Sequence, residues 1–252
     1  MAAAQHPSDK TAGHRARRRI SRRLLPFLFV LSMIAYVNRS NIAPRGVDVS
    51  EACLQPASVA CAVSECEPLE LALVEGATES RRWREQMERY HYLGCRVPFG
   101  ANLRYWVRHG ERELAGLLWT SPAWKMQARD AWIGWDDEQR RRNLQSIVNN
   151  GRFLILPWVQ IKGLASKILA LSARQMPRDW EVRYGRRPLL LETLVDAARF
   201  RGTCYRAANW IHLGQTSGRG RMDRAHTAPG QAIKDIYVYP LLRDTRQRLC
   251  GS

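Results

Sequence analysis

The chain has 252 residues, enough for one full domain with a substantial hydrophobic core. Its formal net charge is +17, with two open explanations: a phosphate-rich partner such as nucleic acid, or a genome that encodes arginine wherever a cation is tolerated. None of its six cysteines forms a C-x-x-C pair and no Cys/His cluster has zinc spacing. That pattern argues against a metal site and favours structural thiols in a reducing compartment.

Residues 1–45 form a basic and hydrophobic N-terminal segment. Arginines accumulate up to Arg23, and the apolar run 24–37 follows. A helix of that length spans about 21 Å, which is short for a membrane core of about 30 Å. The segment could still be a membrane anchor, or an export signal of the twin-arginine type. Residues 22–42 resemble the first transmembrane helix of major facilitator symporters. Because no further hydrophobic span follows, the segment is expected to be a fragment left by a fusion, a frameshift or a mis-called start.

Residues 46–78 have no clear hydrophobic period and contain several prolines and glycines. We interpret them as a linker that carries one helix around Leu69–Val74. From residue 79 to residue 252, helical and strand-like patterns alternate. This alternation predicts a single mixed α/β domain behind the N-terminal segment and the linker.

The first half of this domain contains a predicted helix, a hairpin and an aromatic insertion. Residues 79–92 place Trp83, Met87 and Tyr90 on one helical face, while 103–107 and 114–119 are β-prone runs on either side of a turn. The insertion spans residues 119–148. A helix begins there at Asp136–Glu138, with Leu144, Ile147 and Val148 on its buried face, and Asn149–Gly151 is interpreted as the connection to the next strand.

The stretch 149–210 carries the predicted chemistry. The apolar run 153–156 ends at Pro157, a helical pattern begins at Leu164, and a second apolar run lies at 189–191. This order predicts a strand, a glycine turn, a helix and a second strand in a right-handed crossover. Backbone N–H groups without partners at the start of that helix suit a phosphate group. The predicted phosphate-binding residues are Gln160, Lys162, Gly163, Leu164 and Ala165.

The turn resembles the pyrophosphate loop of the GNAT acyltransferases. Their pattern is Gln or Arg, two residues, Gly, one residue, then Gly or Ala, which Gln160, Gly163 and Ala165 match. A second match is Tyr205, with an aromatic residue five positions on and Asn209 in place of a glycine. Asparagine tolerates the left-handed conformation that ends a helix. The resemblance implies an acyl-coenzyme A cofactor and Tyr205 as the general acid that protonates the leaving thiolate.

Residues from about 90 to 241 resemble, as a whole, the Druantia anti-phage protein DruA family. Stretches that carry the resemblance include Tyr90–Gly94, Arg129–Trp135, Asn149–Val159 and Gly202–Trp210. The similarity is long and collinear. Membership implies a role in phage defence or in mobile-element biology, but it implies no established reaction.

Each candidate residue also has a structural interpretation. Tyr205 could be a core tyrosine. Glu192, at the end of a buried strand, could be a general base because burial raises the pKa of a carboxyl group, or it could pair with an arginine. Arg219 and Arg221, in a glycine-rich loop, could grip a nucleic-acid backbone or remain solvated. His91 is interpreted as structural.

The sequence therefore predicts an α/β (α+β) domain, a GNAT-like mixed sheet flanked by helices and preceded by a hydrophobic N-terminal helix. The leading functional hypothesis is a DruA-like protein of anti-phage defence or transposon biology that engages nucleic acid and other proteins of such systems. The alternatives are an acyl-coenzyme A-dependent acyltransferase and an inactive membrane-tethered fragment. The domain is expected in the cytoplasm, with membrane association only through residues 24–37.

Overall fold

The computed structural model of the chain describes residue 59 and residues 63–216 and 232–251. The N-terminal segment 1–45, with its symporter resemblance, lies outside this part of the chain. Arg219 and Arg221 also lie outside it, so their predicted nucleic-acid contact stays a prediction. Within the described ranges, no helix has both the length and the apolar character needed to cross a membrane.

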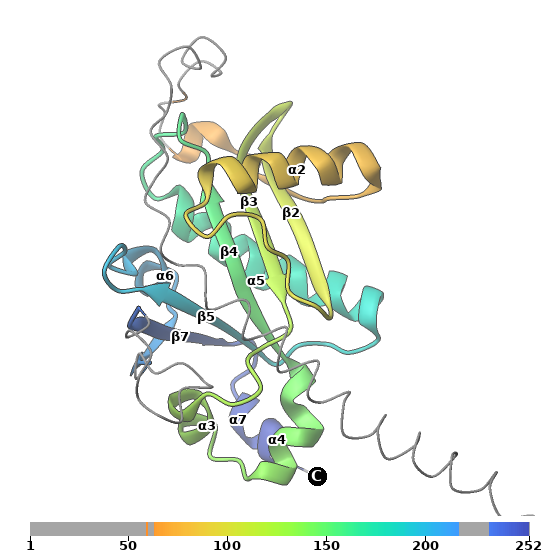
Figure 1. Ribbon diagram of the computed structural model, residues 1–252, viewed down its shortest axis with the longest axis vertical. Helices are drawn as coiled ribbons and strands as arrows, with labels where there is room; N and C mark the ends of the chain where they lie inside the picture. Colours follow the sequence, from red (N-terminus) through yellow and green to blue (C-terminus); the bar gives the residue numbers. More distant parts are fainter. Residues whose placement is uncertain (1–58, 60–62, 217–231, 252) are drawn as a thin grey trace, which may run out of the picture.

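A mixed sheet of seven strands forms the centre of the described fold (Figure 1). Its spatial order is β1-β2-β3-β4-β5-β7-β6, and only the pair β4 and β5 is parallel. The strands are β1 (Glu70–Leu73), β2 (Asn102–His109), β3 (Arg112–Thr120), β4 (Ile147–Ile155), β5 (Leu190–Asp196), β6 (Ile211–Gln215) and β7 (Lys234–Pro240).

Two long helices cover opposite faces of the sheet: α2 (Gly76–Tyr90) in front and α5 (Leu164–Tyr184) behind in Figure 1. Trp83 of α2 donates a hydrogen bond from its indole Nε1 to the carbonyl of Tyr105 at 3.1 Å. The hydroxyl of Tyr105 donates to Asp179 of α5 at 2.9 Å. Because Trp83 and the Tyr105 ring are both fully buried, these contacts fix both helices on β2.

Shorter helices complete the described structure. A smaller apolar cluster joins α3 (Gln127–Ile133) and α7 (Thr245–Cys250) to the ends of the central strands. The next helix, α4 (Asp137–Asn143), contacts α7 through a hydrogen bond from Asn143 Nδ2 to the carbonyl of Leu249 at 3.0 Å. Asp136 caps α4, since its side chain accepts from the backbone N–H groups of Glu138 and Gln139, which confirms the predicted helix start. The remaining elements are η2 (Val63–Cys66), η3 (Leu144–Ser146) and α6 (Thr203–Ala207).

Three local expectations were wrong. The segment around Leu69–Val74 forms strand β1, not a helix, because it pairs with β2 and buries Leu71. Residues 147–151 belong to β4, because they find backbone partners on β3 and β5 that outweigh a local turn. Cys66 is disulfide-bonded, not a thiol, whereas Cys95, Cys204 and Cys250 are free.

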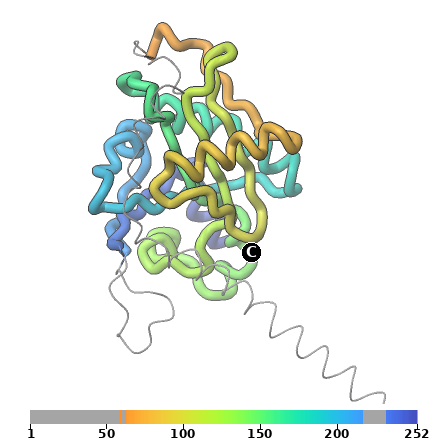
Figure 2. The backbone as a smooth tube through the Cα atoms, turned by 45° about the horizontal axis from the view of Figure 1, so that its top comes forward, coloured from red at the N-terminus to blue at the C-terminus, as the bar shows by residue number. Residues whose placement is uncertain are grey.

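The parallel strands β4 and β5 stay paired over only part of their length. Their register runs from Ile147 opposite Leu190 to Asn150 opposite Thr193. At that point β4 contains a bulge against β3, with Gly151 as the extra residue. Beyond it, β4 continues along β3 while β5 continues along β7, and both views show β5 and β7 turning away from β4 (Figures 1 and 2). Among the residues that the structure describes, the edge of β4 that faces β5 therefore has no strand partner after Asn150.

Candidate functional site

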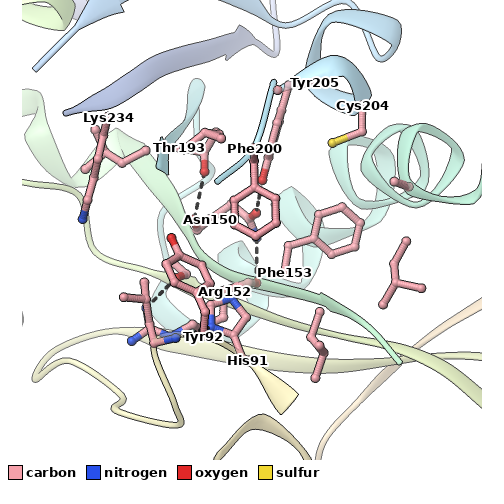
Figure 3. Close-up of a pocket in the computed structure, with 18 of the residues that line it drawn as sticks. His91, Tyr92, Asn150, Arg152, Phe153, Thr193, Phe200, Cys204, Tyr205 and Lys234 are labelled. Atoms are coloured by element: carbon pink, nitrogen blue, oxygen red, sulfur yellow. Dashed lines mark hydrogen bonds between the residues drawn. The ribbon is translucent and has the colours of Figure 1, made fainter. Parts of the chain in front are cut away.

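A cavity of about 490 Å³ lies where β4 and β5 separate (Figure 3). Its walls come from both strands, from α6 and from the loop that follows α2. Ala165 contributes from the first turn of α5, and Lys234 contributes from the start of β7. The cavity is thus lined by one residue of the predicted phosphate-binding turn, Ala165, and by the predicted general acid, Tyr205, whereas Gln160, Lys162, Gly163 and Leu164 do not line it.

Asn150 organises the centre of the cavity at the last paired position of β4. Tyr205 donates from its hydroxyl to Asn150 Oδ1 at 3.0 Å, and Thr193 donates from Oγ1 to the Asn150 carbonyl at 3.1 Å (Figure 3). Tyr205 is only 7% exposed, and burial raises the pKa of its hydroxyl. The hydroxyl therefore keeps its proton at neutral pH and has a fixed position.

The predicted phosphate-binding turn has an open backbone. Gly163 adopts a left-handed conformation with φ of +82°, and a Cβ at this position would meet nothing within 4 Å. Ala165 lines the cavity, whereas Leu164 packs into the core with no exposed surface. The backbone N–H of Gln160 bonds to the carbonyl of Val59 at 2.8 Å, and the side chain of Lys162 is exposed.

The cavity carries positive charge. Its described lining includes Arg152, Arg201 and Lys234 but no aspartate or glutamate. Arg152 is 3% exposed and donates from Nε to the carbonyl of Gly94 at 3.0 Å. Burial and the nearby Arg152 lower the pKa of Lys234. Cationic groups in a half-enclosed site without carboxylates suit an anionic ligand better than a cationic one.

His91, which the sequence suggested was structural, also lines the cavity. The backbone N–H of Leu93 donates to its Nδ1 at 3.2 Å, so the ring proton of the neutral form lies on Nε2. Burial, and then the charge of Arg152, lower the pKa of His91 to about 3. The imidazole is therefore neutral at physiological pH and is a weak base.

Acidification is expected to destabilise the protein through His91. An unfolded histidine binds its proton near pH 6.5, whereas the folded one does so only near 3. Between these values the unfolded state holds the extra proton. The free energy of unfolding therefore decreases as the pH is lowered, by at most about 1.4 kcal/mol per pH unit. Above about pH 6.5 the contribution is fully present. His91→Gln should flatten this slope in urea denaturation, and equal slopes for both proteins would contradict a buried neutral imidazole.

Glu192 lies outside the residues that line the cavity. Its Oε2 accepts from Arg129 Nη1 at 2.9 Å, and both side chains are fully buried. Its Oε1 accepts from the backbone N–H of Ala123 at 3.2 Å. Both carboxylate oxygens of Glu192 therefore accept hydrogen bonds, and Arg129 is the arginine with which it pairs. The described residues also contain no cluster of three His, Cys, Asp or Glu that could hold a metal ion.

Several residues of the cavity carried weak sequence signals. Asn150 belongs to a pair of asparagines that precedes the apolar run 153–156, and the sequence pattern of this pair predicts a turn. Lys234 comes just before the β-prone run 236–239, with only one residue between. Both signals become visible only once the strand register is known. The left-handed conformation expected of Asn209, in contrast, is confirmed, with φ of +61°.

Solved structures to which the chain is similar include acetyltransferases. An aminoglycoside acetyltransferase in complex with coenzyme A has 12% identity and a TM-score of 0.44, covering 71% of this chain and 98% of its own. A Bacillus subtilis acetyltransferase with coenzyme A has 8% identity and a TM-score of 0.44, covering 69% and 99%. A spermidine N-acetyltransferase chimera of Vibrio cholerae has 9% identity and a TM-score of 0.43, covering 73% and 99%.

The predicted mixed sheet flanked by helices is confirmed. The sequence model of the family described as Druantia protein DruA matches residues 50–232, most of the chain. The chain therefore belongs to the DruA family. No curated protein matches the sequence.

Proposed function

We propose that this chain is an acyl-coenzyme A-dependent acyltransferase that acts in anti-phage defence. The observation that carries the proposal is one cavity, which is lined both by Ala165 at the start of α5 and by Tyr205. Membership of the DruA family supports the defence setting. The Q-x-x-G-x-A spacing at Gln160, Gly163 and Ala165 supports the choice of cofactor.

The start of α5 fits a pyrophosphate group. The N–H groups of Ala165 and Ser166 lie in the first helical turn and have no acceptor inside the helix. The missing side chain of Gly163 leaves space for a phosphate to approach the backbone. The dipole of a helix of 21 residues adds partial positive charge at this end.

The unpaired edge of β4 fits the amide-containing arm of coenzyme A. Gly151, Phe153 and Ile155 line the cavity beyond the last pairing with β5. Backbone N–H and C=O groups at a strand edge accept an extended chain as an additional strand. When bound, the cofactor supplies an acyl group activated as a thioester. Arg152 and Lys234 add positive charge that favours the anionic cofactor.

Tyr205 is the general acid in this proposal. Its raised pKa keeps the proton on the hydroxyl until a stronger base forms beside it, and a leaving thiolate is such a group once water is excluded. The hydrogen bond to Asn150 orients the hydroxyl within the cavity. The burial of the tyrosine ring excludes water from the same position.

Acetyl-coenzyme A is expected to stabilise the full chain. A ligand that binds only the folded state adds about 2.7 kcal/mol to the free energy of unfolding at a hundred times its Kd. Urea denaturation with and without acetyl-coenzyme A measures this gain, and adenosine monophosphate at the same concentration controls for general phosphate binding. The absence of any gain at millimolar acetyl-coenzyme A would overturn the proposed function.

A further inference from the structure

The amine of Lys234 extends into the same cavity as the proposed cofactor (Figure 3). Lys234 is the first residue of β7 and lies opposite Asp196 of β5 in the strand register. No hydrogen bond or ion pair holds its amine within the described part of the chain. The carboxylate of Asp196 is engaged elsewhere, by the N–H of Ala198 at 3.1 Å and by Arg199 at 3.4 Å.

The surroundings of Lys234 lower the pKa of its amine, so its neutral form is more populated than in a solvated lysine. Burial penalises the ammonium ion and Arg152 repels it, so its pKa is lowered although Asp196 acts in the opposite direction. The described lining offers no carboxylate that could pair with the charge. A larger share of this amine therefore carries a free lone pair than in a solvated lysine, and that lone pair is the nucleophilic form.

We propose that Lys234 accepts the acyl group in a self-acylation reaction at this cavity. The inference rests on the proposed function, because acyl-coenzyme A must occupy the cavity. It follows from an amine without a partner, held by β7 in the space that also contains Tyr205 and Asn150. His91, the other lining nitrogen base, is too weakly basic to take the role of acceptor.

The step conserves atoms and electrons. The lone pair of neutral Nζ attacks the thioester carbonyl carbon, a C–N bond forms and the C–S bond breaks. The leaving sulfur takes up a proton from the Tyr205 hydroxyl, and the proton that the amine loses restores the hydroxyl. The products are an amide at Lys234 and free coenzyme A, with no change of oxidation state.

Acylation would also regulate the site. An amide at Lys234 removes one of the cationic groups that line the cavity, and it fills part of the space. Both effects disfavour a second anionic cofactor. The modified protein is therefore expected to bind coenzyme A more weakly than the unmodified protein.

Peptide mass spectrometry of the full chain after incubation with acetyl-coenzyme A tests the proposal. Lys234 should gain an acetyl group faster than the exposed Lys125, by about tenfold for each unit by which its pKa lies below that of a solvated lysine. Gly163→Glu should reduce the rate at Lys234 to that at Lys125. Lys234→Arg should lose the product, because a guanidinium group does not accept the acyl group.

The outcomes separate the two proposals. A stability gain from acetyl-coenzyme A together with an unmodified Lys234 would overturn self-acylation and leave the acyltransferase function standing. Equal rates of acetylation at Lys234 and Lys125 would likewise overturn self-acylation and leave the acyltransferase function standing. Modification of Lys234 in the Gly163→Glu variant at the wild-type rate would also overturn it, since the reaction would then be chemical and independent of the site. A failure of cofactor binding would remove both proposals.

Discussion

Replacing Gly163 with glutamate is expected to abolish the stabilisation by acetyl-coenzyme A. The new side chain would occupy open space at the N-terminus of α5, where nothing lies within 4 Å of its Cβ. Its carboxylate would compete with the pyrophosphate for the same backbone N–H groups and repel it. The expected gain of about 2.7 kcal/mol at a hundred times the wild-type Kd should therefore fall to zero.

Gly185→Glu is the matched control for this variant. Gly185 caps the other end of α5, with a left-handed φ of +69° and nothing within 4 Å of its Cβ position. Both substitutions impose the same left-handed strain of about 1–2 kcal/mol and add the same charge. Only the change at Gly163 touches the proposed phosphate site. Loss of the gain in both variants, or in neither, would contradict the assignment of the site.

Glu192→Gln is expected to lower the free energy of unfolding by about 3 kcal/mol, because it leaves the buried Arg129 without its main counter-charge. The guanidinium of Arg129 is fully buried and also bonds to Asp130 at 2.8 Å and to the carbonyl of Ala123 at 2.9 Å. Because these contacts hold the guanidinium in the core, Arg129 cannot move into solvent when the negative charge at position 192 is removed. Urea denaturation of the wild type and the variant measures the loss.

Glu138→Gln provides the comparison at an exposed ion pair. Glu138 pairs with Arg142 at 3.6 Å, and its side chain is 68% exposed. Such surface pairs contribute about 0–1 kcal/mol. Replacing both buried partners, as Arg129→Met with Glu192→Leu, should recover part of the loss, because no isolated charge then remains. A loss at Glu192 no larger than at Glu138 would contradict the structural role that we assign to the pair.

The parts of the fold that could be predicted are those whose signal is local. The helix over α2, the hairpin of β2 and β3, and the strand–turn–helix around Gly163 each depend on spacing within a short window. The Q-x-x-G-x-A turn combines a glycine that requires a left-handed conformation with the start of a long helix. Both are properties of neighbouring residues, so the sequence shows them directly.

The parts that could not be predicted depend on distant partners. The polar residues Asn149 and Asn150 have low β-propensity, yet they extend β4 because β3 and β5 supply backbone partners on both sides. The cavity combines these residues with His91, Lys234 and α6, which come together only through the strand order. Glu192 looked like a candidate base because its partner, Arg129, is 63 positions away in the sequence.

Alkylation of Cys204 tests the central claim most directly, because this free thiol lines the cavity beside Tyr205. Mass spectrometry of the full chain gives its reaction rate with iodoacetamide, and Cys250, a free thiol that does not line the cavity, is the internal reference. At a hundred times its Kd, acetyl-coenzyme A should slow alkylation of Cys204 about a hundredfold and leave Cys250 unchanged, since only about one hundredth of the protein remains unliganded. An unchanged rate at Cys204, under conditions where acetyl-coenzyme A binds, would place the cofactor elsewhere and contradict the account.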